Sequence, residues 1–145
     1  IEKYMNTVNN IETPHLKVLN QYIKDLSYEN LQKNVSQTYD INENDTSIDI
    51  KVIYKPYDKD HFEVLIKITI NCKSKKEQAS IFQLELDYLG FFRVDNIKSF
   101  HRDKLSSEGA KIIFPFARSI VANVTQNGGN IPIVLDNVDF NLIKS

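Results

Sequence analysis

Regular alternation of apolar and polar residues between positions 47 and 88 constrains the fold more than any other feature of this sequence. Successive side chains of a β-strand point to opposite faces, so the alternation predicts strands with one apolar and one polar face. Three such runs follow one another, at Ser47–Tyr57, His61–Asn71 and Ala79–Tyr88. Short polar links join them, which indicates antiparallel hairpins. Helices should therefore cover only the apolar face of this sheet.

A fourth strand is predicted before these three, at Gln21–Asn30. Its alternation assigns Tyr22, Lys24, Leu26 and Tyr28 to one face and Ile23, Asp25, Ser27 and Glu29 to the other. The two carboxylates on one face fit a catalytic pair, a solvated face or a docking patch. Because no histidine or metal-binding cluster is near them in the sequence, we favour a solvated face or a docking patch.

The domain organisation follows from length and composition. The chain has 145 residues, of which 41% are hydrophobic and 26% charged, as expected for one globular domain. Residues 1–20 are polar and rich in asparagine, so we expect a flexible N-terminal arm there. Residues 21–145 should form a single domain.

A long helix is predicted within residues 112–129, ending at the glycines of Asn127-Gly128-Gly129. Its apolar stripe consists of Ile113, Phe116, Ala117, Ile120 and Val124, widened by Phe114 and Val121. This arc covers about half of the helix circumference, which is more than a helix packed on one sheet needs. We expect contact with the sheet and with a second layer; an ordinary core helix is the alternative. Pro115 should either kink the helix or begin its second helical segment.

The last part of the chain should lie on the same face as the helix. Asn130–Leu135 contains Pro132 and is predicted to be extended. Residues 136–143 are predicted to form a short final helix, capped by Asp136 or Asn137. The expected fold is thus α+β: a four-stranded antiparallel sheet with a long and a short helix on one face.

The sequence offers little for catalysis. His15, His61 and His101 are scattered, and none of the common metal, nucleophile or phosphate-binding motifs occurs. Cys72 is interpreted as a buried thiol at a strand end. We therefore expect no cofactor, no metal and no enzymatic activity, although a small-ligand-binding or enzymatic α+β domain remains an alternative.

Charge and hydropathy also narrow the partners. A formal net charge of −1 argues against a nucleic-acid partner, and no apolar run is long enough for membrane insertion. A single cysteine suits a reducing, cytoplasmic compartment. Aromatic residues that a helical layer would not obviously cover are Tyr28, Phe91, Phe92 and Phe140. They suggest a surface that binds extended apolar peptide, with packing into the core as the alternative for each.

Several stretches, taken in order, resemble the SecB family of protein-export chaperones. They are QYIKDLSYEN at 21–30, FEVLIKITI at 62–70, FQLELDYLGFF at 82–92, IIFPFARSIVANVTQNGG at 112–129 and IPIVLDNVDFNLI at 131–143. Together they cover most of the chain beyond the arm, and FPFAR, the glycine stop and VDF at this spacing are specific. The chain departs from the family at Asn30-Leu31, where a proline is common, and at Val35, where an aromatic is common.

The resemblance implies a homotetramer, built as a dimer of dimers, with the long helices between the dimers. It implies an ATP-independent holdase that keeps precursor proteins unfolded and delivers them to SecA, the export motor. The family's SecA-binding face maps onto Asp25, Glu29 and Glu85, with Gln83 beside them. A SecB-like chaperone dedicated to one partner, such as an antitoxin, is the alternative within the family.

Two further residue sets are expectations on the same basis. Clients should bind a groove lined by some of Leu26, Tyr28, Val35, Phe140 and Leu142. The oligomer interface should involve Leu84, Leu86, Phe116 and Ile120.

Overall fold

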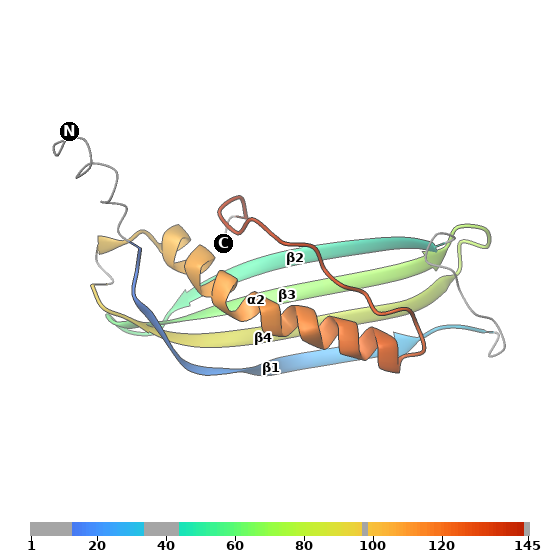
Figure 1. Cartoon of the computed structure of the whole chain (residues 1–145), viewed down its shortest axis with the longest axis horizontal. Coiled ribbons are helices and arrows are strands. Elements are labelled where there is room, and N and C mark those ends of the chain that lie inside the picture. The colour runs from blue at the N-terminus through green and yellow to red at the C-terminus, as the bar shows by residue number, and fades with distance from the viewer. Residues whose placement is uncertain (1–12, 34–43, 97–98, 144–145) are drawn as a thin grey trace, which may run out of the picture.

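Four antiparallel strands and one long helix make up the computed structural model, which describes residues 13–33, 44–96 and 99–143 (Figure 1). The elements are β1 (Leu16–Asn30), β2 (Asn44–Pro56), β3 (His61–Ser74), β4 (Ser80–Val94) and α2 (Arg102–Asn127). In the sheet the strands lie in the order β1-β4-β3-β2, and each neighbouring pair is antiparallel. The predicted sheet and long helix on one face are confirmed.

The core lies between α2 and the sheet. Side chains of β3 alternate between buried and partly exposed along the whole strand, and the buried ones face the helix. From α2, the residues Ile113, Ala117 and Val121 are fully buried. Glycines permit this close packing, since a Cβ added at Gly109 would lie 2.8 Å from the Val64 side chain.

Strand β1 begins at Leu16, so the prediction of a flexible arm through residue 20 is wrong for its last part. Leu16 pairs with Val94 and Val18 with Phe92 at the far end of β4. Leu16 and Val18 pack against the core, which holds this end of the strand on the sheet. Residues 1–12 of the expected arm lie outside the described residues.

A β-bulge in β1 corrects the predicted assignment of faces. The pairing with β4 shifts between Val18 and Asn20 and again between Ile23 and Asp25, which leaves Leu19 and Lys24 as extra residues. We call the second of these, at Lys24, the β1 bulge. One extra residue reverses the alternation, so Tyr22 lies on the face opposite to Leu26 and Tyr28. Asp25 and Glu29 nevertheless share one face, because both follow the bulge.

Helix α2 starts at Arg102, earlier than the apolar pattern indicates. The His101 side chain caps it by accepting a hydrogen bond from the backbone N–H of Asp103 at 3.2 Å. In its first turns, the buried residues include Ser106, Ser107 and Gly109. These small residues are not apolar, so they do not extend the apolar pattern of the sequence. Pro115 lies inside the helix.

The glycine stop at the end of α2 is confirmed. Gly128 donates its backbone N–H to the Val124 carbonyl at 2.8 Å, and Gly129 has φ of 85°. A positive φ favours glycine, which explains the glycine at position 129. Helix α2 lacks the apolar content of a membrane-crossing segment, and the described residues offer no other candidate.

The short final helix predicted at 136–143 does not form. Residues 131–139 run extended, and a turn follows in which Asp139 accepts the backbone N–H groups of Asn141 at 3.0 Å and Leu142 at 3.2 Å. An aspartate that bonds two residues ahead stabilises a turn instead of a helix. The expected cap residue Asn137 instead accepts a hydrogen bond from Arg118 at 3.1 Å. Thr125 ties the segment to α2 by accepting the N–H of Ile133 at 2.9 Å.

Candidate docking face and client groove

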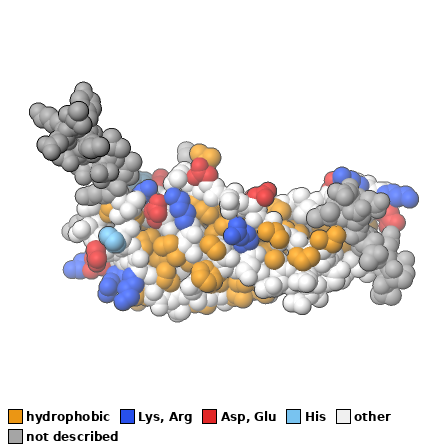
Figure 2. Space-filling view, viewed as in Figure 1, with side chains coloured by type: hydrophobic (Ala, Val, Ile, Leu, Met, Phe, Trp, Pro, Cys, Tyr) orange, Lys and Arg blue, Asp and Glu red, His pale blue; other side chains and the backbone are white. Residues whose placement is uncertain are grey.

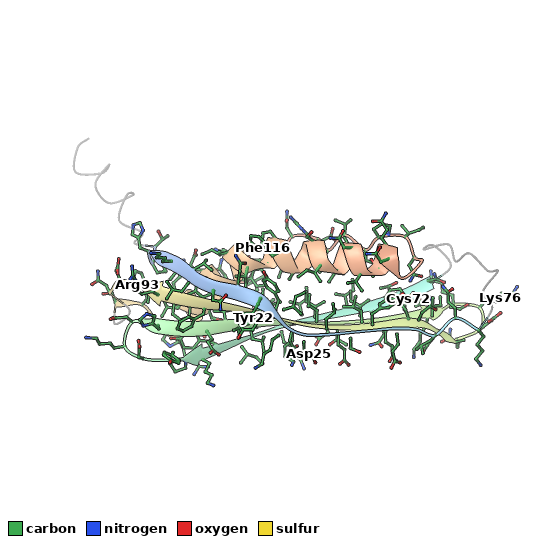
Figure 3. The ribbon with its side chains drawn as sticks, turned by 90° about the horizontal axis from the view of Figure 1, so that it is seen from below. Tyr22, Asp25, Cys72, Lys76, Arg93 and Phe116 are labelled. Carbon is green, nitrogen blue, oxygen red and sulfur yellow. The ribbon has the colours of Figure 1, made fainter. Side chains whose placement is uncertain are left out.

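The sheet face opposite α2 carries no second layer among the described residues (Figure 3). On this open face, residues directly opposed across neighbouring strands point to the same side. The strand register therefore shows which side chains it brings together. Asp25 points away from α2, toward this open side (Figure 3).

The predicted SecA-binding residues lie together on the open face. Glu29 is directly opposite Gln83, and Glu85 is opposite Ser27 in the next pair. Asp25 follows, opposite Asp87. Asp25, Glu29, Gln83 and Glu85 are all exposed. With Asp87 they form a continuous surface that we call the acidic patch.

Sequence reasoning did not include Asp87 or Asp49 in this site. Asp87 forms an ion pair with Lys67, with 3.0 Å between Oδ2 and Nζ, and this pair partly neutralises the charge of Asp87. Asp49 lies in the same row as Glu85, with Thr69 between them. Alternation within β4 already places Asp87 on the face of Gln83 and Glu85, whereas only the cross-strand register brings Asp49 into the same row as Glu85.

Three carboxylates of the patch have no counter-charge within the described part of the chain. Asp25, Glu29 and Glu85 take part in no ion pair there, in contrast to Asp87. Like charges on adjacent strands repel one another. Such a surface can therefore attract a basic partner.

The predicted client-binding residues differ in how exposed they are. Leu26 and Leu142 are exposed, at 38% and 81%. Phe140 is buried and meets Phe114 edge to face, with 5.2 Å between ring centroids. Val35 lies outside the described residues. The C-terminal segment that carries Phe140 and Leu142 runs on the β2 side of α2, away from β1 (Figure 1). The structure does not bring these residues into one groove.

A hollow beside the end of α2 was not predicted. It is a small, partly open depression with a cavity volume of about 20 Å³, enough for about one water molecule. Its walls come from β2, the ends of β3 and β4, and the extended C-terminal segment: Asn44, Thr46, Cys72, Phe82, Asn130, Ile131 and Ile133. The extended segment gave only a weak pattern in the sequence, so its role as a wall could not be seen there.

Tyr28 connects β1 to this hollow. Its ring stacks on Phe82 with a centroid distance of 5.7 Å. Its hydroxyl donates to the Gly128 carbonyl at 3.3 Å and accepts from the Asn130 amide at 2.7 Å. Burial raises the pKa of the Tyr28 hydroxyl, which keeps it protonated as a donor. Tyr28 thus fixes the hollow's wall and is only partly accessible to a client.

Of the predicted interface residues, two belong to the core. Leu84 and Leu86 are at most 1% exposed beneath α2, so their assignment to an oligomer interface was wrong. Phe116 is 50% exposed and Ile120 is partly exposed. Hydrophobic side chains gather along α2 and toward β1 (Figure 2). The exposed hydrophobic side chains on these two elements are Leu19, Ile23, Leu26, Ile112 and Phe116, whereas Tyr22 is exposed on the open face of the sheet.

Cys72 and the potential metal ligands of the described residues form neither a metal-binding cluster nor an exposed thiol. No group of three or more metal-ligating side chains occurs within residues 13–33, 44–96 and 99–143. Cys72 is buried, and burial raises the pKa of its thiol, which disfavours the reactive thiolate. Thr46 donates a hydrogen bond to its sulfur at 3.7 Å. This fits the predicted buried thiol at a strand end.

A sheet with one open, acidic face and one face covered by a long helix defines a small α+β binding protein. The family described as "Preprotein translocase subunit SecB" matches residues 9–143. The chain belongs to the SecB family, as the resemblance of its motifs predicted.

Relatives and a solved structure agree with this assignment. Protein-export protein SecB of Dinoroseobacter shibae is 41% identical over 133 residues, which are 88% of this chain and 74% of that protein. The same protein from Rickettsia felis is 37% identical over 139 residues, covering 94% and 90%. A SecB-like chaperone of Mycobacterium tuberculosis, solved with a peptide from an antitoxin, superimposes with a TM-score of 0.68. Its 8% identity, over 85% of this chain and 90% of that chain, supports the fold alone.

Replacing Gly128 tests the contact between Tyr28 and the end of α2. A Cβ at this position would lie 2.1 Å from the Tyr28 hydroxyl oxygen, so Gly128→Ala should lower the free energy of unfolding by roughly 1–3 kcal/mol. In a Tyr28→Ala background the clash is gone, and the same substitution should be neutral or slightly stabilising. Urea unfolding of the four proteins measures the difference. An equal cost in both backgrounds would contradict the contact.

Proposed function

We propose that the protein is an export chaperone that holds precursor proteins unfolded without ATP and delivers them to the SecA motor. Its membership of the SecB family and the names of its relatives support this function. The single structural observation that carries it is the acidic patch on an open sheet face. The carboxylates of Asp25, Glu29 and Glu85 in this patch, unpaired among the described residues, offer a basic segment of the motor charge complementarity and fast association.

Client holding is assigned to the other face. Exposed apolar side chains border α2, and a hollow lies between β2 and the extended C-terminal segment. Unfolded polypeptides present apolar segments in many sequences, so several adaptable contacts serve better than one shaped pocket. Among the predicted client residues, the proposal keeps Leu26 and Leu142 as contacts and Tyr28 at the wall of the hollow.

Assembly is assigned to the apolar surface of α2. Phe116 points away from the sheet (Figure 3) and is half exposed, and this exposed apolar surface supports the proposal of a second layer there. We assign Phe116 and Ile120 to the interface of a homotetramer, a dimer of dimers, in the cytoplasm. The alternative of a dedicated antitoxin chaperone is supported only by a structure that shares the fold, so we give it second place.

A holding assay tests the proposed activity. We expect the protein to suppress aggregation of an unfolded precursor without nucleotide, because apolar burial needs no energy source. Leu26→Ser combined with Leu142→Ser should weaken suppression several-fold, since both side chains are exposed. Light scattering of the diluted precursor measures the effect. No suppression by excess wild-type protein would refute the holdase function.

Assembly is tested by a charge on the outer side of α2. Phe116→Lys should reduce the tetramer to smaller species, because association would bury an unpaired charge. Ile131→Lys is a matched control, since Ile131 is 53% exposed and lies on the extended segment. Multi-angle light scattering at micromolar concentration gives the masses. A monomeric wild-type protein, or a Phe116→Lys variant that keeps the tetramer mass, would refute this assignment.

Motor docking is tested by reversing one charge of the acidic patch. Glu85→Lys should weaken SecA binding about tenfold at low salt, and Asp25→Lys should behave alike. The difference from wild type should shrink at 1 M salt, where the screening length is about 3 Å. Client holding should be unchanged.

A matched control gives this test its specificity. Asp95→Lys makes the same charge change in the turn after β4, about 33 Å along the strand from Glu85. It should leave SecA affinity unchanged. If Glu85→Lys and Asp95→Lys have equal effects, the acidic patch is an ordinary solvated surface.

A further inference from the structure

An apolar row crosses the open sheet face next to the acidic patch. It consists of Tyr22, Leu89, Leu65 and Ile53, which are directly opposed on four adjacent strands. Tyr22 and Ile53 are 45% and 46% exposed, and Leu65 is partly exposed. Leu89 is buried, yet it does not belong to the core beneath α2. The β1 bulge creates this row, because it turns Tyr22 to the open face.

The apolar row is continuous with a cluster of aromatic side chains. Phe91 is the next residue of β4 on the open face after Leu89. The His61 ring stacks on Phe91 at 5.6 Å, and Tyr57 meets Phe91 edge to face at 5.3 Å. Tyr57 is 69% exposed. Aromatic and aliphatic contacts thus extend from the middle of the open face to one end.

The net charges on either side of the row have opposite signs, although each side is mixed. On the side of the acidic patch, Lys67 and Lys51 lie in the adjoining row beside Asp87, and on the other side Glu63 lies opposite Phe91 and Lys55. The acidic patch adjoins it directly, since Asp87 and Leu89 are successive open-face residues of β4, about 7 Å apart. Beyond the aromatic cluster, Lys17 and Arg93 are directly opposed, and neither takes part in an ion pair with described residues. The nearby carboxylate of Asp58 is engaged by His61 at 2.7 Å. A basic segment is therefore attracted to one side of the row and repelled from the other.

We propose that the apolar row is a second contact for the docking segment of the motor, which carries an aliphatic or aromatic residue adjacent to its basic residues. The basic residues lie on the acidic patch, and the apolar residue lies on Tyr22, Leu65, Leu89 and Ile53. Lys17 and Arg93 fix the direction by excluding the basic part from the far end. This inference rests on the proposed function, because it names the chemistry of the same partner.

The two contacts differ in their response to salt, which separates them in one experiment. Charge attraction is screened by salt, whereas burial of apolar surface is not. Ile53→Asn should weaken SecA binding about fivefold, since a half-exposed isoleucine would become buried on docking. The loss should persist at 1 M salt, where the effect of Glu85→Lys disappears.

Ile48 provides a matched control on the same strand. It is 45% exposed, as Ile53 is 46% exposed, but it lies opposite Ile70 on the helix-covered face. Ile48→Asn should leave SecA affinity unchanged. Urea unfolding should show that both variants remain folded, because both positions are exposed.

A peptide pair tests the chemistry of the partner directly. One synthetic peptide carries three lysines followed by two leucines, and the other carries serines in place of the leucines. The leucine peptide should bind wild type several-fold more tightly than the serine peptide, and Ile53→Asn should abolish this preference while Ile48→Asn retains it. Equal binding of both peptides to wild type would overturn the inference.

The remaining outcomes separate this inference from the proposed function. If Glu85→Lys weakens SecA binding but Ile53→Asn does not, the inference fails and the proposed function stands. If wild-type protein does not bind SecA, both fail. If Ile53→Asn instead lowers the assembly mass, the row is a contact between copies of the chain and the inference is overturned.

Discussion

Packing of α2 against one face of the sheet is the interaction on which the rest of the structure depends. The alternating side chains of β3 and β4 are buried on the helix side, and truncating one such leucine or isoleucine typically costs about 2–5 kcal/mol. The second layer consists of one long helix and the C-terminal segment that follows it. No described residues cover the opposite face of the sheet. One-sided burial thus provides both stability and a free surface for partners.

The bulge in β1 divides this free surface. Before the bulge, Tyr22 points to the open side, and after it Asp25 and Glu29 do. A regular strand would place Tyr22 with Leu26 on the helix side and would leave no apolar row beside the carboxylates. One inserted residue therefore joins apolar and acidic surface on a single face, which is why we regard the bulge as a functional feature.

Much of the fold could be predicted from sequence because its strands are amphipathic and its helix ends at glycines. Alternation also placed Asp25 with Glu29 on one face of β1, whereas the resemblance to the SecB family was needed to join Glu85 to them. Lys24, by contrast, gives no local sign that it is a bulge, since the pairing with β4 decides this. The early turns of α2 were missed because Ser106, Ser107 and Gly109 are buried without being apolar. The hydrogen bond from Arg118 to Asn137 and the local turn at Asp139 similarly replace the helix that the capping residues suggested for residues 136–143.

The two faces are linked through Tyr28 and its strand. Tyr28 lies on the helix side of β1, bonded to Gly128 and Asn130 at the wall of the hollow, while its neighbours Ser27 and Glu29 face the acidic patch. A client that displaced the extended segment at Asn130 would remove the shortest hydrogen bond of Tyr28, at 2.7 Å. The end of β1 would then be held less firmly where it presents Glu29. Since any coupling between two binding sites is reciprocal, the proposed docking of the motor on this strand would in turn change client affinity. The proposed function requires release of the client to a motor, and β1 is the element that connects the two proposed sites.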